Sequence, residues 1–280
     1  MKKRIGVIGY GNMGSAIAER LKAAGYQVSV FDKDKNKTKN LEGLKVTKNI
    51  TDAIKQTDVV ILAIKPQDFD IVLNEAKGIL SGQLIISIAA GIPTAYIERV
   101  LGKVKVVRTM PNLPAKIGKG MICLSKGKYA TEADLGLAQK LFSHLGDTMK
   151  LDEKKMDAAT AVTGSGPGFF YKLIQIENIN PNNLTEIKEF ATSEFIPACT
   201  ASATSIGFSD TQAKVLVVST TNGTIDLLKS SGLTPKQLEN AVKSRKGTTE
   251  AGLNKLRGIA SLKQAIKAAF KRARELSKKE

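Results

Sequence analysis

Residues 4–14 read RIGVIGYGNMG, a short β-branched run that leads into glycines at positions 9, 11 and 14. This G-x-G-x-x-G spacing lies between an expected strand and an expected helix, which is the context that dinucleotide binding requires. Gly9 permits the tight turn, Gly11 leaves space for a pyrophosphate, and Gly14 lets the helix pack closely on the strand. The alternative is a glycine-rich turn that binds nothing. We predict a dinucleotide-binding turn formed by Gly9, Tyr10, Gly11, Asn12, Met13 and Gly14.

The alternation of strand and helix continues through the first half of the chain and stops in the second half. Up to about residue 150, β-branched runs alternate with helical stretches, which is typical of βαβ units and a parallel sheet. After residue 152 the strand signals stop, and apolar residues recur three and four apart, as in helices. We predict a doubly wound α/β domain over residues 1–152 and an all-helical domain over residues 153–280, interrupted near residues 178–183 and at Gly207. The predicted strands are residues 4–8, 27–31, 45–46, 59–64, 84–88, 105–108 and 120–124, and the predicted helices lie near residues 15–24, 51–56, 70–80, 94–101 and 131–145.

The composition excludes several classes of protein. The 280 residues are 42% hydrophobic and 25% charged, as in ordinary globular proteins, and not as in disordered or collagen-like chains. One histidine and two distant cysteines, Cys123 and Cys199, do not supply a metal cluster, so no metal site is expected. The basic start followed by an apolar stretch imitates a secretory signal, but the glycines interrupt that stretch. We therefore expect no membrane span and a cytoplasmic location.

The net charge of +17 would suit an anionic small molecule, an acidic membrane or nucleic acid. The densest basic stretch, residues 263–279, places lysines and arginines opposite Leu262, Ile266, Ala269 and Phe270, which predicts the solvated face of a terminal amphipathic helix. Aromatic residues make up only 5% of the chain and tryptophan is absent, so platforms for base stacking are not expected. Small anionic ligands are therefore the favoured partners, and nucleic acid is not.

Asp32 ends the second expected strand, 18 residues after Gly14. An acid there usually accepts hydrogen bonds from the adenosine ribose and repels a 2′-phosphate, which favours NAD over NADP. Lys33 and Lys35 follow directly and could hold such a phosphate, so both cofactors stay open. The alternative for Asp32 is a simple turn residue in Asp-Lys-Asp-Lys.

Two further groups of residues lie where ligands are expected. Ala63, Lys65 and Pro66 follow one strand and Ala89, Ala90 and Gly91 follow the next, at the carboxyl edge where open α/β sheets bind ligands. The small side chains would leave room for a flat ring such as nicotinamide. The alternative is that they are small only because the strand ends are closely packed. Residues 244–249 offer hydroxyls and N–H groups before a helix, which suits either a carboxylate site or an ordinary helix cap.

Five ordered segments besides the glycine turn make the chain resemble the pyrroline-5-carboxylate reductases. They are residues 62–67 (LAIKPQ), 87–91 (SIAAG), 108–114 (RTMPNLP), 163–167 (TGSGP) and 247–253 (GTTEAGL). The resemblance implies an N-terminal Rossmann domain, a C-terminal helical domain that forms a homodimer or larger ring, and NAD(P)H-dependent reduction of 1-pyrroline-5-carboxylate to L-proline.

The resemblance also implies roles for single residues. Ser244, Gly247 and Thr248 match the residues that bind the substrate carboxylate, Thr249 matches the threonine that reaches the substrate nitrogen, and Asn49 matches a cofactor-ribose contact. Met110, Pro111 and Asn112 fall in a matching segment expected at the cofactor. The chain departs from the family at Arg245 and Lys246, where proline and glycine are usual, and in about 20 extra residues between Ile174 and Ala201. A reductase of another imino, keto or hydroxy acid, or a catalytically silent dinucleotide-binding protein, therefore remains an alternative.

Overall fold

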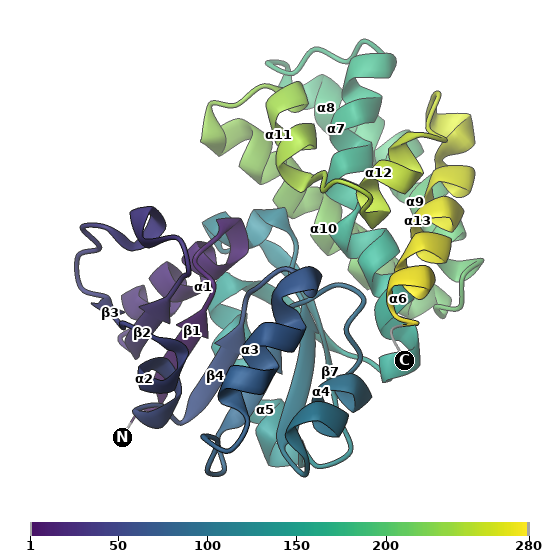
Figure 1. Cartoon of the computed structure of the whole chain (residues 1–280). Coiled ribbons are helices and arrows are strands. Elements are labelled where there is room, and N and C mark those ends of the chain that lie inside the picture. The colour runs from purple at the N-terminus through teal and green to yellow at the C-terminus, as the bar shows by residue number, and fades with distance from the viewer. Residues whose placement is uncertain (1, 279–280) are drawn as a thin grey trace. The chain divides into compact units, whose positions relative to one another are not determined.

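A computed structural model describes residues 2–278, and the chain divides into two compact units (Figure 1). The first unit contains residues 2–110 and 123–153, and the second contains residues 111–122 and 154–278. The second unit thus takes a short segment, residues 111–122, from within the predicted N-terminal domain.

The first unit is built on an eight-stranded sheet with the order β3-β2-β1-β4-β5-β6-β7-β8. The predicted parallel arrangement is confirmed for β1 to β6. The sheet then continues with β7, predicted as a strand at residues 120–124, and with β8. The sequence had indicated neither the antiparallel direction of β7 nor the existence of β8. The strands are β1 (Arg4–Ile8), β2 (Gln27–Phe31), β3 (Lys45–Val46), β4 (Val59–Leu62), β5 (Leu84–Ser87), β6 (Lys105–Met110), β7 (Gly120–Lys126) and β8 (Gly146–Lys150).

Helices cover the sheet in two groups. Helix α3 contacts both α2 and α4, whereas α1 and α5 share contacts with the short turn at residues 143–145. Central strands such as β4 and β5 are buried along their whole length, as expected for parallel strands covered on both faces. The helices are α1 (Asn12–Ala23), α2 (Ile50–Lys55), α3 (Phe69–Ala76), α4 (Thr94–Leu101) and α5 (Glu132–Phe142).

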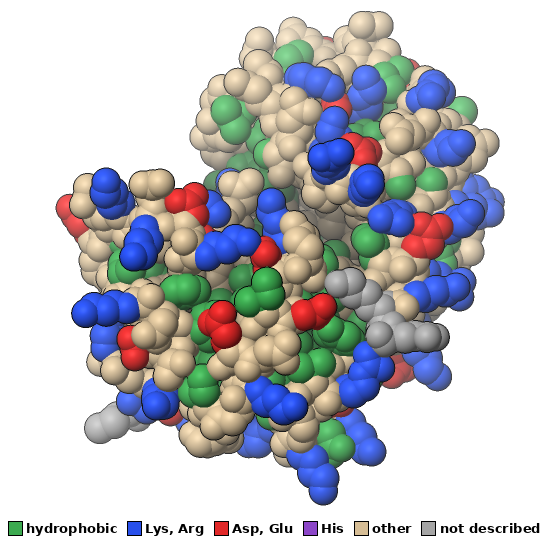
Figure 2. Space-filling view, in the orientation of Figure 1, with side chains coloured by type: hydrophobic (Ala, Val, Ile, Leu, Met, Phe, Trp, Pro, Cys, Tyr) green, Lys and Arg blue, Asp and Glu red, His purple; other side chains and the backbone are tan. Residues whose placement is uncertain are grey.

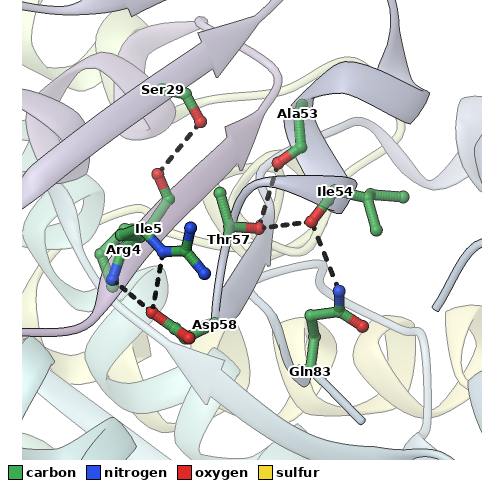
Figure 3. Close-up of polar contacts among 8 residues, drawn as sticks. All are labelled: Arg4, Ile5, Ser29, Ala53, Ile54, Thr57, Asp58 and Gln83. Atoms are coloured by element: carbon green, nitrogen blue, oxygen red, sulfur yellow. Dashed lines mark hydrogen bonds and ion pairs between the residues drawn. The ribbon is translucent and has the colours of Figure 1, made fainter. Parts of the chain in front are cut away.

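Side chains tie the strands together at the amino-terminal edge of the sheet (Figure 3). The Asp58 carboxylate, just before β4, accepts hydrogen bonds from the Arg4 backbone N–H at 2.8 Å and from Arg4 Nε at 3.4 Å. The Thr57 hydroxyl and the Gln83 amide both donate to the Ile54 carbonyl at the end of α2. The last two bonds satisfy the Ile54 carbonyl, which the end of the helix leaves without a partner. The opposite, carboxyl edge carries the residues predicted to bind ligands.

The second unit is helical, as predicted, and its breaks fall where the sequence indicated them. Helix α7 ends before Asn178, which has a positive φ of 55°, and α9 ends before Gly207, with a φ of 110°. The helices are α6 (Met156–Ala159), α7 (Gly166–Ile176), α8 (Leu184–Phe190), α9 (Ile196–Thr204), α10 (Asp210–Ser231), α11 (Pro235–Val242), α12 (Thr248–Leu253) and α13 (Leu262–Leu276).

Two wide π-helical turns, residues 160–164 and 191–195, precede α7 and α9. Each lies just before a proline in the first turn of the following helix, Pro167 or Pro197. Because proline has no N–H, it cannot donate to the carbonyl four residues earlier, and the widened turn accommodates that missing bond.

The region between Ile174 and Ala201, in which extra residues are expected, contains α8 and the π-helical turn after it. Phe190 and Phe195 from this segment pack on Phe170 of α7, with ring centroids 6.0 and 4.9 Å apart. All three rings are almost fully buried. This region therefore contributes Phe190 and Phe195 to the core of the second unit.

The terminal helix α13 is amphipathic as predicted. Leu262, Ile266 and Ala269 are fully buried, whereas Lys263 and Lys267 are exposed. In Figure 2 the basic side chains are scattered over the visible face and interspersed with acidic ones. Within residues 2–278, no helix has the length and apolar character needed to cross a membrane.

Candidate active site

The glycine turn between β1 and α1 has the geometry that its spacing predicts. Gly9 has a φ of +99°, and a Cβ atom there would lie 2.4 Å from the Ala63 carbonyl oxygen. A Cβ on Gly14 would lie 2.0 Å from the Gly9 oxygen. A Cβ on Gly11 would meet no atom within 4 Å. Two glycines are therefore required by the fold, whereas Gly11 leaves open space at the start of α1, where a phosphate group fits.

A cleft of about 390 Å³ lies beside this turn, within the first unit. Among the predicted cofactor residues, those that line it are Gly9, Gly11, Asp32, Lys33, Ala63 and Lys65. The sequence reasoning missed Lys37, Gln67 and Asp68, which also line it. Gln67 and Asp68 follow directly after the predicted Lys65-Pro66, so proximity in the sequence was a usable signal for them. We call this space the cofactor cleft.

Asp32 is fixed at the end of β2. Its side chain is only 7% exposed, and its carboxylate accepts hydrogen bonds from the backbone N–H groups of Tyr10 at 2.7 Å and Asp34 at 2.8 Å. Lys37 Nζ lies 3.5 Å away. Through Asp34, the Asp32 carboxylate stabilises the turn after β2, and through Tyr10 it joins β2 to the glycine turn. Asp32 also lines the cofactor cleft.

Tyr10, within the glycine turn, is also held by its side chain. Its hydroxyl donates to Glu19 of α1 at 2.9 Å. Burial, together with the hydrogen bond to the negatively charged Glu19, raises the pKa of Tyr10 to about 12. The side chain therefore fastens the turn to the helix that follows it.

The remaining predicted cofactor residues of the first unit lie at the carboxyl edge or near it. Ala63, Ala89 and Met110 follow or end the adjacent strands β4, β5 and β6, so they share one edge of the sheet. Asn49 caps α2, because its amide oxygen accepts from the Asp52 N–H at 2.8 Å. Further predicted residues outside the lining of the cofactor cleft are Asn12, Met13, Pro66, Ala90 and Gly91.

Pro111 and Asn112 belong to the second unit. The Asn112 side chain is 2% exposed, donates to the Thr163 carbonyl at 3.2 Å and accepts from the Met121 N–H at 3.0 Å. The Thr163 carbonyl lies four residues before Pro167, which cannot donate to it, so Asn112 supplies the bond that the proline lacks. The amide group of Asn112 therefore has a structural role.

The predicted substrate loop connects α11 to α12. Gly247 packs closely on Ser244, since a Cβ there would lie 2.1 Å from the Ser244 hydroxyl oxygen and 3.0 Å from the Ser244 carbonyl oxygen. Lys246 has a positive φ of 56°, unusual for a residue with a side chain. Its N–H donates to the Glu250 carboxylate at 2.7 Å, and its carbonyl accepts from Arg272 Nε at 2.9 Å. These two bonds hold the left-handed backbone at Lys246.

Three buried hydroxyls meet directly after this loop. The Thr249 hydroxyl donates to Ser165 Oγ at 3.2 Å, and Ser165 Oγ lies 3.0 Å from Thr248 Oγ1. Ser165 is fully buried, and both threonines are less than 10% exposed. The sequence reasoning missed Ser165, although its segment, TGSGP, contributed to the resemblance. The fold thus brings Ser165 to two predicted substrate residues that are more than 80 positions away.

Comparison with known proteins identifies both parts of the chain. Residues 4–91 match a family model described as NADP oxidoreductase, coenzyme F420-dependent, and residues 191–279 match one described as pyrroline-5-carboxylate reductase dimerisation. The chain is 32% identical to a pyrroline-5-carboxylate reductase of Methanosarcina acetivorans, over 99% of both chains. It is 33% identical to that of Pseudomonas aeruginosa, over 98% of this chain and 97% of the relative.

Solved structures agree with the sequence relatives. A pyrroline-5-carboxylate reductase of Coxiella burnetii superposes with a TM-score of 0.66 at 28% identity, over 99% of this chain and 100% of the other. A pyrroline carboxylate reductase of Plasmodium falciparum, solved with NADP bound, gives 0.64 at 26% identity over 98% of both chains. The similarity therefore extends through both units.

Proposed function

The chain belongs to the pyrroline-5-carboxylate reductase family, and we propose on that premise that it reduces 1-pyrroline-5-carboxylate to L-proline with NADH or NADPH. The observation that carries the proposal is the buried hydroxyl cluster of Ser165, Thr248 and Thr249, next to the loop matched to the substrate carboxylate. The glycine turn and the cofactor cleft of the first unit fit a dinucleotide.

The reaction needs little acid–base machinery from the protein. A reduced nicotinamide cofactor, held at the glycine turn and the cofactor cleft, would supply the hydride that the imine carbon needs. With a proton on the nitrogen, the product would be the secondary amine of proline. A protonated cyclic imine is already electrophilic, so correct positioning of the reactants supplies much of the rate. The role of the chain is then to orient the imine and to hold its carboxylate.

Thr249 is our candidate for orienting the substrate nitrogen. Its hydroxyl donates to Ser165, which leaves a lone pair of its oxygen to accept a hydrogen bond from an iminium N–H. Ser244, Gly247 and Thr248 are the candidates for the carboxylate. The excess of basic side chains favours the approach of anionic substrate and cofactor.

We further propose that NADH is the preferred cofactor. Asp32 lines the cofactor cleft and is held in place by two backbone N–H groups, so it would repel a 2′-phosphate. Among the lysines considered from the sequence, Lys33 lines the cleft and Lys35 does not. Lys37, which also lines the cleft, is paired with Asp32.

The helical unit is our proposed site of self-association, into a homodimer or a larger ring. A dimerisation family model matches residues 191–279, and α10 exposes Val215 and Val218 within that range. We propose a cytoplasmic location, because the buried residues Cys123 and Cys199 are not joined in a disulfide. Burial raises the pKa of Cys199 to about 12, so this thiol is inert at neutral pH.

The direct test is steady-state oxidation of NADH and NADPH by the purified protein, with and without 1-pyrroline-5-carboxylate. Thr249→Ala should lower kcat/KM about 100-fold because it removes the orienting hydroxyl, whereas Thr249→Ser should stay within about fivefold of the parent. Thr221→Ala is a matched control, since the Thr221 hydroxyl is buried but bonds within α10. Bound dinucleotide without turnover of this imine would contradict the proposal.

A reductase of another imino or keto acid is the second candidate, favoured by the two basic residues in the substrate loop. Arg245 and Lys246 are exposed there, where the family usually has proline and glycine. Added positive charge would suit a substrate with a second anionic group. A panel of cyclic imines with and without an extra carboxylate distinguishes the candidates by kcat/KM.

A further inference from the structure

Besides Lys65, the cofactor cleft is lined by two acid–base pairs. Asp32 pairs with Lys37 at 3.5 Å, and Lys33 pairs with Asp68 at 2.7 Å. The second pair joins the segment after β2 to the segment after β4, across the cleft that both segments line.

The two pairs differ in mobility. Asp32 is 7% exposed and accepts hydrogen bonds from two backbone N–H groups, so its carboxylate cannot turn away without breaking both bonds. The Lys33 side chain is 74% exposed, so it can reorient at little cost. Asp68, at 23% exposure, is the more fixed member of that pair. Lys33 is therefore the group whose position depends on its partner.

Lys33 lies at the position where a protein of this fold can distinguish NAD from NADP. It directly follows Asp32 at the end of β2, the place at which such folds contact the 2′ position of the adenosine ribose. A lysine ammonium there stabilises a 2′-phosphate, and a carboxylate repels it. The hydrogen bond to Asp68 raises the pKa of Lys33, so Lys33 is charged whenever the pair is formed.

We propose that Asp68 is a specificity-determining residue for the cofactor: by pairing with Lys33, it withholds that ammonium group from a 2′-phosphate and favours the dinucleotide with a free 2′-hydroxyl. The inference rests on the proposed role of this cleft as the dinucleotide site. Selection at the 2′ position then depends on two acids, Asp32 by direct repulsion and Asp68 through Lys33.

The test measures dissociation constants of NADH and NADPH for the full-length protein in the absence of imine, from nucleotide fluorescence. Asp68→Asn keeps the shape of the side chain and removes its charge. NADPH should then bind about fivefold more tightly, while the dissociation constant of NADH should change less than twofold. The expected effect is small because the ion pair between Lys33 and Asp68 is exposed. Asp70→Asn is the control with the same change in net charge. Asp70 accepts a hydrogen bond from the Tyr96 hydroxyl and does not line the cleft, so this variant should leave the NADPH to NADH ratio unchanged.

A double variant tests whether Asp68 acts through Lys33. In a Lys33→Gln background, Asp68→Asn should no longer tighten NADPH binding, because no ammonium group is released. An equal gain in both backgrounds, or equal gains for NADH and NADPH, would overturn the inference, and so would a parent protein that binds neither dinucleotide. A protein that binds both but reduces no imine would refute the proposed function alone.

Discussion

The turn at Gly9–Gly11 and the turn at Ser244–Gly247 both lead the chain into a helix, but they obtain a left-handed backbone in different ways. In the first, Gly9 takes a φ of +99°, and no side chain would fit because the Ala63 carbonyl is too close. In the second, Lys246 takes a φ of 56° while its side chain points into solvent. Which residue the first turn accepts is limited by the space around Gly9, and in the second turn it is limited by the energy of a positive φ at Lys246.

The second turn compensates for its lysine with hydrogen bonds from outside. Glu250 accepts from the Lys246 N–H, and Arg272 donates to the Lys246 carbonyl. A non-glycine residue in this region costs about 1–2 kcal/mol, which two such bonds can offset. Glycine is thus irreplaceable where another part of the backbone passes close by, as at Gly9, and replaceable where only φ is constrained, as at Lys246.

The largest predicted effect follows from crowding in the first turn. Gly14→Ala places a methyl group 2.0 Å from the Gly9 oxygen, so it should destabilise the protein by about 3 kcal/mol and abolish NADH binding. Gly11→Ala meets no protein atom, so its free energy of unfolding should stay within about 0.5 kcal/mol of the parent while NADH binding weakens at least about tenfold. Urea unfolding and NADH titration measure the two effects. Equal destabilisation by both substitutions would show that the turn is not limited by space.

A smaller effect of opposite sign is expected in the second turn. Lys246→Gly relieves the strained φ at a cost in unfolded-state entropy, so it should stabilise the protein by about 0.5 kcal/mol. Arg245→Gly, one position earlier and without a positive φ, should destabilise it by about 0.5–1 kcal/mol. Chemical unfolding of the two variants side by side checks the signs, and a destabilised Lys246→Gly would indicate that the lysine side chain stabilises the loop.

The smallest effect concerns the tyrosine of the first turn. The pKa of Tyr10 is raised to about 12, so the folded state keeps this proton more tightly than the unfolded state does. The resulting stability is fully present below pH 10 and is lost as pH rises from about 10 to about 12. Ultraviolet titration should show the Tyr10 phenol ionising near pH 12, besides Tyr96 and Tyr171, whose pKa values are also raised. Glu19→Gln should move the Tyr10 phenol toward 10 without reaching it, because burial remains. No change on Glu19→Gln would contradict the role of that hydrogen bond.

Much of the first unit could be predicted because its signals are local. The strands at residues 4–8, 27–31 and 45–46 have the predicted limits, and so does the helix at residues 94–101. The predicted helix 131–145 ends earlier, at Phe142, and leads into β8. Ser143–Leu145 form a short 3₁₀ turn instead, and Leu145 is buried there as it would be in a longer helix, so periodicity could not separate a helical end from a turn before a strand.

The antiparallel edge of the sheet illustrates what local patterns cannot show. Residues 120–124 were predicted as a strand, but a buried apolar run has the same composition whichever way it pairs. The structure connects β6 to β7 through residues 111–119, which contain the short 3₁₀ turn at Leu113–Ile117. Direction was decided by that connection and by pairing with β6.

The sequence by itself determined the glycine turn, the alternation of strands and helices, the helical second half and the family, because each depends on residues close together in the chain. Only the tertiary structure brought Ser165 to Thr249 and Asp68 to Lys33. The reason is physical: hydrogen bonds and ion pairs act over a few ångströms in space, and the fold, not the spacing in the sequence, brings such partners within that range.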